Sequence, residues 1–201
     1  MLKVGLTGGL ASGKSFVSEA LTGLGCHVLH ADEVGHEVLE PGHEAYEPVV
    51  AEFGLDILNE DGTINRRHLA AIVFSDPARL AKLNSLIHPA VFRREEEFMR
   101  EAAAADPGAI VVVEAAILVE TGSYKKFDRL VVTVCDRETQ IRRAMKRDGL
   151  TREEVEARLR RQLPVEELRR AADYAIDTSG TKENTLAQVQ ELYRALRSLG
   201  Q

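Results

Sequence analysis

The feature that most constrains this chain is a glycine-rich segment near the start of the sequence. Gly8-Gly9-Leu10-Ala11-Ser12-Gly13-Lys14-Ser15 matches the spacing G-x-x-x-x-G-K-[ST] at every defined position. The residue frequencies of this chain would give only ~0.003 such matches by chance. An apolar run at residues 2–7 precedes the segment, and a helical pattern at 15–24 follows it. Strand, loop and helix in this order aim backbone N–H groups at an anion, so we expect a phosphate-binding loop.

The residue types in this loop predict distinct roles. Glycine has no Cβ and therefore lets the backbone approach a phosphate closely. We expect Lys14 to reach the β and γ phosphates of a nucleotide, and the hydroxyl of Ser15 to ligate Mg²⁺. The alternative is a glycine-rich strand-to-helix turn with an incidental lysine.

Apolar runs rich in β-branched residues alternate with helical patterns along most of the chain. The expected strands are residues 2–7, 26–30, 109–115, 129–134 and 174–177. The expected helices of this part are residues 15–24, 139–147, 151–162, 165–172 and 184–199. Thr151 and Glu154 have the spacing of a capping box at a helix start. The alternation predicts a three-layer α/β fold with a parallel five-stranded sheet.

Residues 35–104 interrupt this alternation. They contain helical patterns at 43–53, 66–74 and 77–104 but no convincing buried strand. We therefore predict a nucleotide-binding core of residues 1–34 and 105–201 with an inserted helical domain at 35–104. His88-Pro89 is expected to mark a bend between two helices, because proline disfavours helix in the residue before it. The expected core of the insertion includes its phenylalanines, which are Phe53, Phe74, Phe92 and Phe98.

The composition excludes several classes of protein. With 201 residues, 44% of them hydrophobic and 29% charged, the chain is neither a low-complexity disordered segment nor a fibrous repeat. No window approaches 18 uninterrupted apolar residues, and the first residues lack the pattern of a signal peptide. We therefore expect a cytoplasmic protein that does not bind membranes. Cys26 and Cys135 lie in apolar runs, so we expect buried, unreactive thiols rather than a disulfide or metal site.

The charge is unevenly distributed. The formal net charge is −6, yet residues 137–170 hold ten arginines and one lysine against seven acidic residues. A basic segment on an acidic body favours a local anionic ligand over a nucleic-acid surface, which needs a broad positive face. We expect this segment to form a lid. The alternative is a solvated helix face with intrahelical ion pairs.

Further motifs narrow the class of nucleotide-binding protein. No N-K-x-D string is present, so nothing in the chain matches the guanine-binding motif of a GTPase. Segments that resemble dephospho-CoA kinases follow in order from residue 3 to about 180. They are GLTGGLASGKS, HADEVGHEVLEPG, INRRHLAAIVF, His88-Pro89, ILVE, Gln140 with Arg143 and Arg147, Gln162-Leu163-Pro164 and IDTSG. Two departures stand out: Ala116-Ile117-Leu118 replaces the usual Pro-Leu-Leu, and Thr178 replaces the usual Asn.

The resemblance implies a P-loop kinase that uses ATP and Mg²⁺ to phosphorylate the ribose 3′-hydroxyl of dephospho-CoA. It implies acceptor contacts for Asp32 and His88. The ATP-binding residues are then expected to be Gly8, Ala11, Ser12, Gly13, Lys14, Ser15 and Phe16. The inserted domain would bind the acceptor. The same-class alternative is a kinase for another nucleoside or nucleotide, and the different-class alternative is a non-catalytic ATP-binding switch.

The expected catalytic residues are Asp32, Lys14, Arg143 and Arg147. Asp32 follows a predicted strand, at the edge where open α/β sheets bind ligands, and could accept or orient the proton of the attacking hydroxyl. Its alternative role is a helix N-cap. Arg143 and Arg147 are four residues apart on one helix face, where guanidinium groups could contact the triphosphate. The sequence predicts no oligomeric state.

Overall fold

The computed structural model describes residues 1–199, in which the chain divides into two compact units. The first unit comprises Met1–Leu29 and the chain from Glu101 onward, and the second comprises His30–Arg100. No helix within the described part is long and apolar enough to span a membrane. The strands are β1 (Leu2–Gly8), β2 (His27–His30), β3 (Ile110–Glu114), β4 (Arg129–Val134) and β5 (Tyr174–Asp177). The helices are α1 (Lys14–Gly23), α2 (Ala31–Glu37), α3 (Tyr46–Phe53), α4 (Arg66–Phe74), α5 (Pro77–Ala105), α6 (Arg137–Asp148), α7 (Arg152–Leu159), α8 (Val165–Ala171) and α9 (Lys182–Leu199), with short 3₁₀ segments η1 (Leu55–Ile57) and η2 (Ser123–Lys126).

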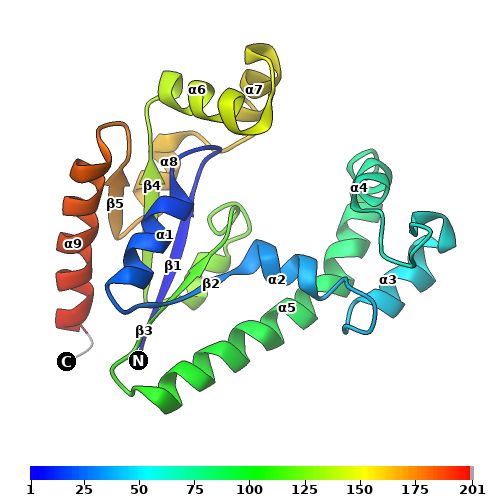
Figure 1. Cartoon of the computed structure of the whole chain (residues 1–201), viewed down its shortest axis with the longest axis horizontal. Helices are drawn as coiled ribbons and strands as arrows, with labels where there is room; N and C mark the ends of the chain where they lie inside the picture. Colours follow the sequence, from blue (N-terminus) through cyan, green and yellow to red (C-terminus); the bar gives the residue numbers. More distant parts are fainter. Residues whose placement is uncertain (200–201) are drawn as a thin grey trace. The chain divides into compact units, whose positions relative to one another are not determined.

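The five strands form one sheet, as the alternating pattern predicts, and the structure gives their order as β2-β3-β1-β4-β5 (Figure 1). The central strand β1 pairs in parallel with β3 on one side and with β4 on the other, and β4 pairs in parallel with β5. The continuous β-branched runs explain this arrangement, because strands covered on both faces need apolar residues at every position. The carboxyl end of the central strand leads directly into the glycine-rich loop.

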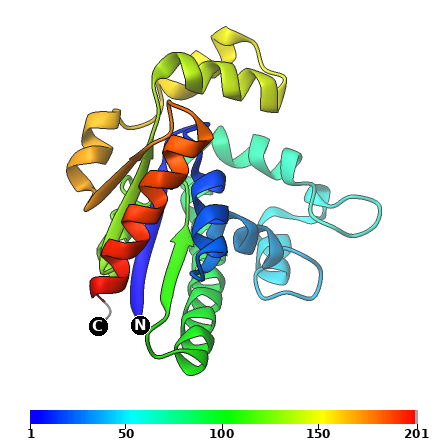
Figure 2. The ribbon, with the colours of Figure 1, turned by 60° about the vertical axis from the view of Figure 1, so that its left-hand side comes forward.

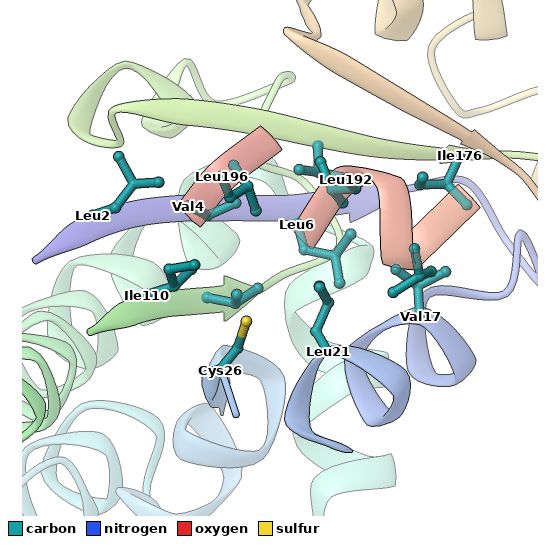
Figure 3. Close-up of a cluster of buried hydrophobic side chains, with 13 residues drawn as sticks. Leu2, Val4, Leu6, Val17, Leu21, Cys26, Ile110, Ile176, Leu192 and Leu196 are labelled. Atoms are coloured by element: carbon teal, nitrogen blue, oxygen red, sulfur yellow. The ribbon is translucent and has the colours of Figure 1, made fainter. Parts of the chain in front are cut away.

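Alternate residues of β1 build the main core on one face of the sheet. Leu2, Val4 and Leu6 pack there against side chains of α1 and α9, as Figure 3 shows. The two helices lie side by side on this face (Figure 2). Cys26 belongs to the same cluster, and burial raises the pKa of its thiol to about 11. The prediction of a buried thiol is therefore confirmed for Cys26.

The opposite face of the sheet is covered by a second apolar cluster. Leu130, Val132 and Val134 of β4 belong to this cluster, together with Leu168 of α8. Helices therefore cover both faces, which confirms the predicted three-layer architecture. Cys135 corrects one expectation: it is only half-buried, because it follows the end of β4 at Val134 and lies outside the strand.

The second unit, residues 30–100, is helical apart from one isolated antiparallel bridge between Leu58 and Ile64. Its buried hydrophobic residues are aliphatic or small, among them Val34, Val38, Leu39, Val49, Ile57, Leu69 and Val73. The expected phenylalanine core is wrong: Phe74 is 77% exposed, Phe92 is 42% exposed, and Phe53 and Phe98 are half-buried.

The structure also lacks the break between two helices that was expected at His88-Pro89. Helix α5 runs for 29 residues through Pro89. A proline inside a helix removes one backbone hydrogen bond and crowds the preceding turn. A helix this long retains many other hydrogen bonds and buried contacts, so it continues through the position.

Candidate active site

The glycine-rich loop has the backbone geometry that its sequence predicts. Gly13 is the N-cap of α1 with a φ of 85°, in the left-handed region that favours glycine. A Cβ on Gly8 would lie 2.6 Å from the carbonyl oxygen of Thr133 and 2.7 Å from the Ser12 hydroxyl oxygen. Gly8 is therefore required by close packing at the end of β1.

Side chains from distant parts of the first unit hold this loop in place. The Leu10 N–H donates to Gln162 Oε1 at 2.9 Å, and Gln140 Nε2 donates to the Leu10 carbonyl at 2.9 Å. The buried hydroxyls of Ser12 and Thr133 share a hydrogen bond of 2.7 Å. The loop is therefore ordered by the protein itself, which lowers the entropic cost of binding a ligand there.

A pocket of about 470 Å³ opens beside the loop, and we call it the cationic pocket. Its lining residues are Ala11, Ser12, Gly13, Lys14, Ser15, Phe16, Arg143, Lys146 and Arg147. Four of them carry positive charge, and no acidic residue is among the described residues that line it. Such a cavity concentrates positive potential and suits a polyanionic ligand.

The cationic pocket brings together most of the residues expected to bind ATP, along with the two lid arginines. Gly8 does not line it, but the Gly8 carbonyl accepts a hydrogen bond of 2.9 Å from Lys14 Nζ. Ser15 lies in the first turn of α1 with an exposed hydroxyl group. The first N–H groups of a helix have no acceptor within the helix, so this turn presents donors to an anion.

The lid arginines differ in their surroundings. Arg143 is half-buried and donates to the carbonyl oxygen of Thr178 at 2.6 Å and to its hydroxyl at 3.0 Å. Arg147 is 61% exposed and donates to the two carboxylate oxygens of Asp148 at 2.7 and 3.0 Å. Arg147 holds the pKa of Asp148 below its ordinary value, mainly through these hydrogen bonds.

Helices α6 and α7 form one packed element next to the loop, residues Arg137–Asp148 and Arg152–Leu159. The capping box at Thr151 and Glu154 is present, as predicted. Arg152 donates to both carboxylate oxygens of Glu138, at 3.1 and 2.6 Å, and so links the two helices. Their buried cluster of Ile141, Ala144 and Val155 also contacts Leu10 and Ala11 of the loop. The pair of helices α6 and α7 is therefore packed against the loop as well as joined internally, and its role as a lid stays a prediction.

Four further residues contribute to this site in ways that the sequence does not predict. Lys146 lines the cationic pocket, and its position between Arg143 and Arg147 in the sequence is the signal that could have found it. Gln140 and Gln162 belong to motifs in the sequence, but only the structure shows their contacts to Leu10. Thr178 is buried, with its hydroxyl donating to the Ser12 carbonyl at 2.7 Å.

Asp32 and His88 belong to the second unit. Asp32 is exposed in the first turn of α2, whose N-cap is His30 and lacks a side-chain cap hydrogen bond. The alternative that Asp32 caps this helix is therefore wrong. His88 is exposed on α5, with its ring centroid 5.7 Å from that of Phe92. The functional roles of Asp32 and His88 stay predictions.

The donor chemistry around Ser15 fits a magnesium ion that is shared with a nucleotide. Within residues 1–199, no group of three or more His, Cys, Asp or Glu side chains could hold a metal ion. Mg²⁺ usually keeps several waters and combines few protein oxygens with substrate phosphates. An exposed serine hydroxyl beside Lys14 and the helix N-terminus could supply one such oxygen.

Comparisons with known proteins agree with this geometry. The family model for dephospho-CoA kinase matches residues 2–184. A dephospho-CoA kinase of Aquifex aeolicus is 40% identical over 98% of this chain and 98% of its own length. The structure titled TT1252 from Thermus thermophilus has a TM-score of 0.85 and 32% identity, with 96% of each chain covered. The dephospho-CoA kinase structure from Campylobacter jejuni shares the fold, with a TM-score of 0.72 and 24% identity over 99% of this chain and 98% of that one. The chain therefore belongs to the dephospho-CoA kinase family.

Proposed function

We propose that this protein transfers the γ-phosphoryl group of ATP to the 3′-hydroxyl of the ribose of dephospho-CoA, which yields coenzyme A and ADP. The observation that carries this proposal is the match of the family model over residues 2–184, together with a cationic pocket built on the glycine-rich loop. A phosphoryl transfer enzyme needs a cradle for phosphates, cations on the transferring oxygens and a group that receives the hydroxyl proton.

The phosphate chain of ATP would lie along residues 11–16, with its oxygens facing backbone N–H groups at the start of α1. Lys14 would leave the Gly8 carbonyl and donate to the β and γ phosphates. Ser15 Oγ would be a ligand of Mg²⁺, which would supply positive charge beside the phosphate oxygens when bound.

Arg143 and Arg147 would stabilise the charge that builds on the transferring group. Both line the cationic pocket on one face of α6, and guanidinium groups match phosphate oxygens with two parallel donors. Fixed donors in a site that excludes water are worth more than the same donors in solution. Arg143 is held in place by Thr178, whereas Arg147 would exchange its contact with Asp148 for a phosphate.

Asp32 would accept or orient the proton of the attacking ribose hydroxyl. The oxygen of that hydroxyl forms a bond to the γ phosphorus, while the bond from that phosphorus to the β-phosphate oxygen breaks and ADP leaves. Asp32 comes two residues after β2 ends, and ligands of open α/β sheets bind outside the carboxyl ends of the strands. The helical unit of residues 30–100, including His88, would bind the acceptor. A cytoplasmic location stays a prediction.

A panel of acceptors tests the proposal. The purified chain is incubated with ATP and magnesium, and dephospho-CoA, AMP, CMP, dTMP and pantetheine are offered separately while ADP release is measured. We expect dephospho-CoA to be the fastest acceptor, with a product phosphorylated at the 3′ position by mass spectrometry and phosphorus NMR. Faster turnover of AMP or CMP would favour a kinase for another nucleotide. ADP release that no acceptor raises would favour an ATP-binding switch.

A further inference from the structure

We propose that Thr178 is a positioning residue, whose hydroxyl group sets the direction of a phosphate-binding N–H group and the placement of Arg143. The inference rests on the proposed function only in requiring that the cationic pocket binds the phosphates of a nucleotide. Thr178 follows β5, is 3% exposed and does not line the pocket. It would therefore act through its neighbours and not by touching the ligand.

The first part of this role concerns the loop. Thr178 Oγ1 donates to the Ser12 carbonyl oxygen at 2.7 Å, and this bond joins residues 166 positions apart. In a trans peptide, the carbonyl and the N–H of the following residue point in opposite directions. Fixing the Ser12 carbonyl toward Thr178 therefore aims the Gly13 N–H away from Thr178. Gly13 lines the cationic pocket, where that N–H can meet a phosphate.

The packing around Gly13 supports the same conclusion. A Cβ built on Gly13 would lie 3.1 Å from Thr178 Oγ1 and 3.2 Å from Thr178 Cβ. The threonine side chain therefore lies directly against the Gly13 backbone and limits its rotation. Gly13 has a φ of 85°, so the loop depends on this neighbour to keep a conformation that only glycine adopts freely.

The second part of this role concerns Arg143 on helix α6. The Thr178 hydroxyl has one proton, which it donates to Ser12, and its lone pairs accept from Arg143 Nη1 at 3.0 Å. The Thr178 carbonyl accepts from Arg143 Nη2 at 2.6 Å, and its N–H donates to the Val134 carbonyl at 2.9 Å. One residue thus connects the loop, the end of β4 and the lid helix.

The test removes the hydroxyl group of Thr178 by substitutions that nearly keep the shape of the side chain. Thr178→Val keeps the branched side chain and removes the hydroxyl. Thr178→Ser keeps the hydroxyl. The side chain in Thr178→Ala differs from that of the serine variant only by the missing oxygen atom. Thr185→Val is the matched control: Thr185 is 2% exposed in α9, its hydroxyl donates to the Thr181 carbonyl, and it does not line the pocket.

The experiment measures the dissociation constants of ADP and ATP with magnesium by calorimetry, on the whole chain and without acceptor. We expect roughly tenfold weaker binding in Thr178→Val and Thr178→Ala, because a buried carbonyl loses its donor and the Gly13 N–H loses its direction. Thr178→Ser and Thr185→Val should bind within about threefold of the wild type, as expected where the positioning hydroxyl is kept. Calorimetry without acceptor also separates this inference from the choice of substrate.

Turnover gives a second readout that a purely structural role would not move. The KM for ATP should rise in the variants that lack the hydroxyl, while the KM for dephospho-CoA stays unchanged. The inference is overturned if Thr178→Val binds nucleotide as the wild type does, or if its loss equals that of Thr185→Val. It is also overturned if Thr178→Ser binds no better than Thr178→Ala, a comparison that remains available should the valine variant fail to fold.

Discussion

The guanidinium group of Arg143 donates to two atoms of Thr178, the carbonyl oxygen at 2.6 Å and the hydroxyl oxygen at 3.0 Å, while Arg143 also lines the cationic pocket. A guanidinium has five N–H donors, so donors remain for a phosphate. Arg143 is therefore ordered before nucleotide arrives, and less side-chain entropy is lost on binding. Its placement is a property of the folded core.

Replacing Lys14 with Ala should abolish most phosphoryl transfer and leave the fold intact. The variant loses one charge at the phosphates, worth about 3 kcal/mol or more for a preorganised donor. In the folded protein, the substitution removes the hydrogen bond from Lys14 Nζ to the Gly8 carbonyl. Steady-state turnover and melting temperature are measured on one preparation, with exposed Lys125→Ala as control. If Lys14→Ala kept more than a tenth of wild-type turnover, Lys14 would not be a group that stabilises the transition state.

The sequence predicts the sheet and the loop well because both depend on local patterns. Short apolar runs identify all five strands, and the continuous β-branched runs of β3 and β4 are typical of strands buried on both faces. The order of strand, glycine-rich loop and helix is also local, so it places residues 11–16 at the pocket. Residue type and spacing suffice for features of this kind.

The contacts that hold the site together could not be predicted in the same way. The bonds from Leu10 to Gln162 and from Thr178 to Ser12 join residues 152 and 166 positions apart. Spacing carries no information on such pairs, because they form only when strands and helices have packed. Residue type also does not predict which side chains are buried in the helical unit. Phe74 is strongly exposed, although phenylalanine is a residue type that favours a core.

Replacing Asp148 with Asn should tighten ATP binding. Asp148 accepts two hydrogen bonds from Arg147, which has to leave them to reach a phosphate. The asparagine lacks the negative charge that competes for the guanidinium. Exposed ion pairs are worth about 0.2–1 kcal/mol, so the gain in affinity should be at most roughly fivefold.

The affinity for ATP is measured by calorimetry in Asp148→Asn, in Arg147→Ala and in the double variant. The gain from Asp148→Asn should disappear when Arg147 is already absent, because nothing is then released. A gain of the same size in the Arg147→Ala background would show that Asp148 acts on the nucleotide directly and not through Arg147.

The stability of helix α6 should depend on pH through its N-cap residue, Asp136. The N–H of Thr139 donates to this N-cap carboxylate at 2.8 Å and lowers the pKa of Asp136 below its ordinary value of 3.8. A carboxyl with a lowered folded-state pKa contributes stability above its unfolded pKa and loses it as pH falls through the folded value. Asp136→Asn keeps the cap without the titration.

The free energy of unfolding is measured in urea between about pH 5 and about pH 2.5, below which the carboxylates are largely protonated. The wild type should lose more stability over this range than Asp136→Asn, while Asp136→Ala should be less stable at every pH. Asp56→Asn, at an exposed carboxylate in η1, serves as the control and should follow the wild type. Equal slopes for the wild type and Asp136→Asn would mean that the charge on Asp136 does not support the helix.

Replacing Asp32 with Asn tests the proposed chemistry most directly, because its alternative role as a helix cap is excluded by the structure. The N-cap of α2 is His30, and Asp32 is exposed in the first turn. The substitution should therefore leave the melting temperature nearly unchanged. Turnover should fall by roughly 10² to 10⁴, because an amide cannot accept the hydroxyl proton.

Glu33→Gln is the matched control for Asp32→Asn, since it removes the same charge from the next residue of the same helix turn. A general effect of charge near the helix N-terminus would lower turnover in both variants, whereas proton acceptance predicts a loss in Asp32→Asn alone. ADP affinity, measured by calorimetry, should stay within about threefold of the wild type in both, as expected for a group that acts on the acceptor hydroxyl. Near-normal turnover in a stable Asp32→Asn protein would defeat the proposed mechanism, even if the chain still converted dephospho-CoA to coenzyme A.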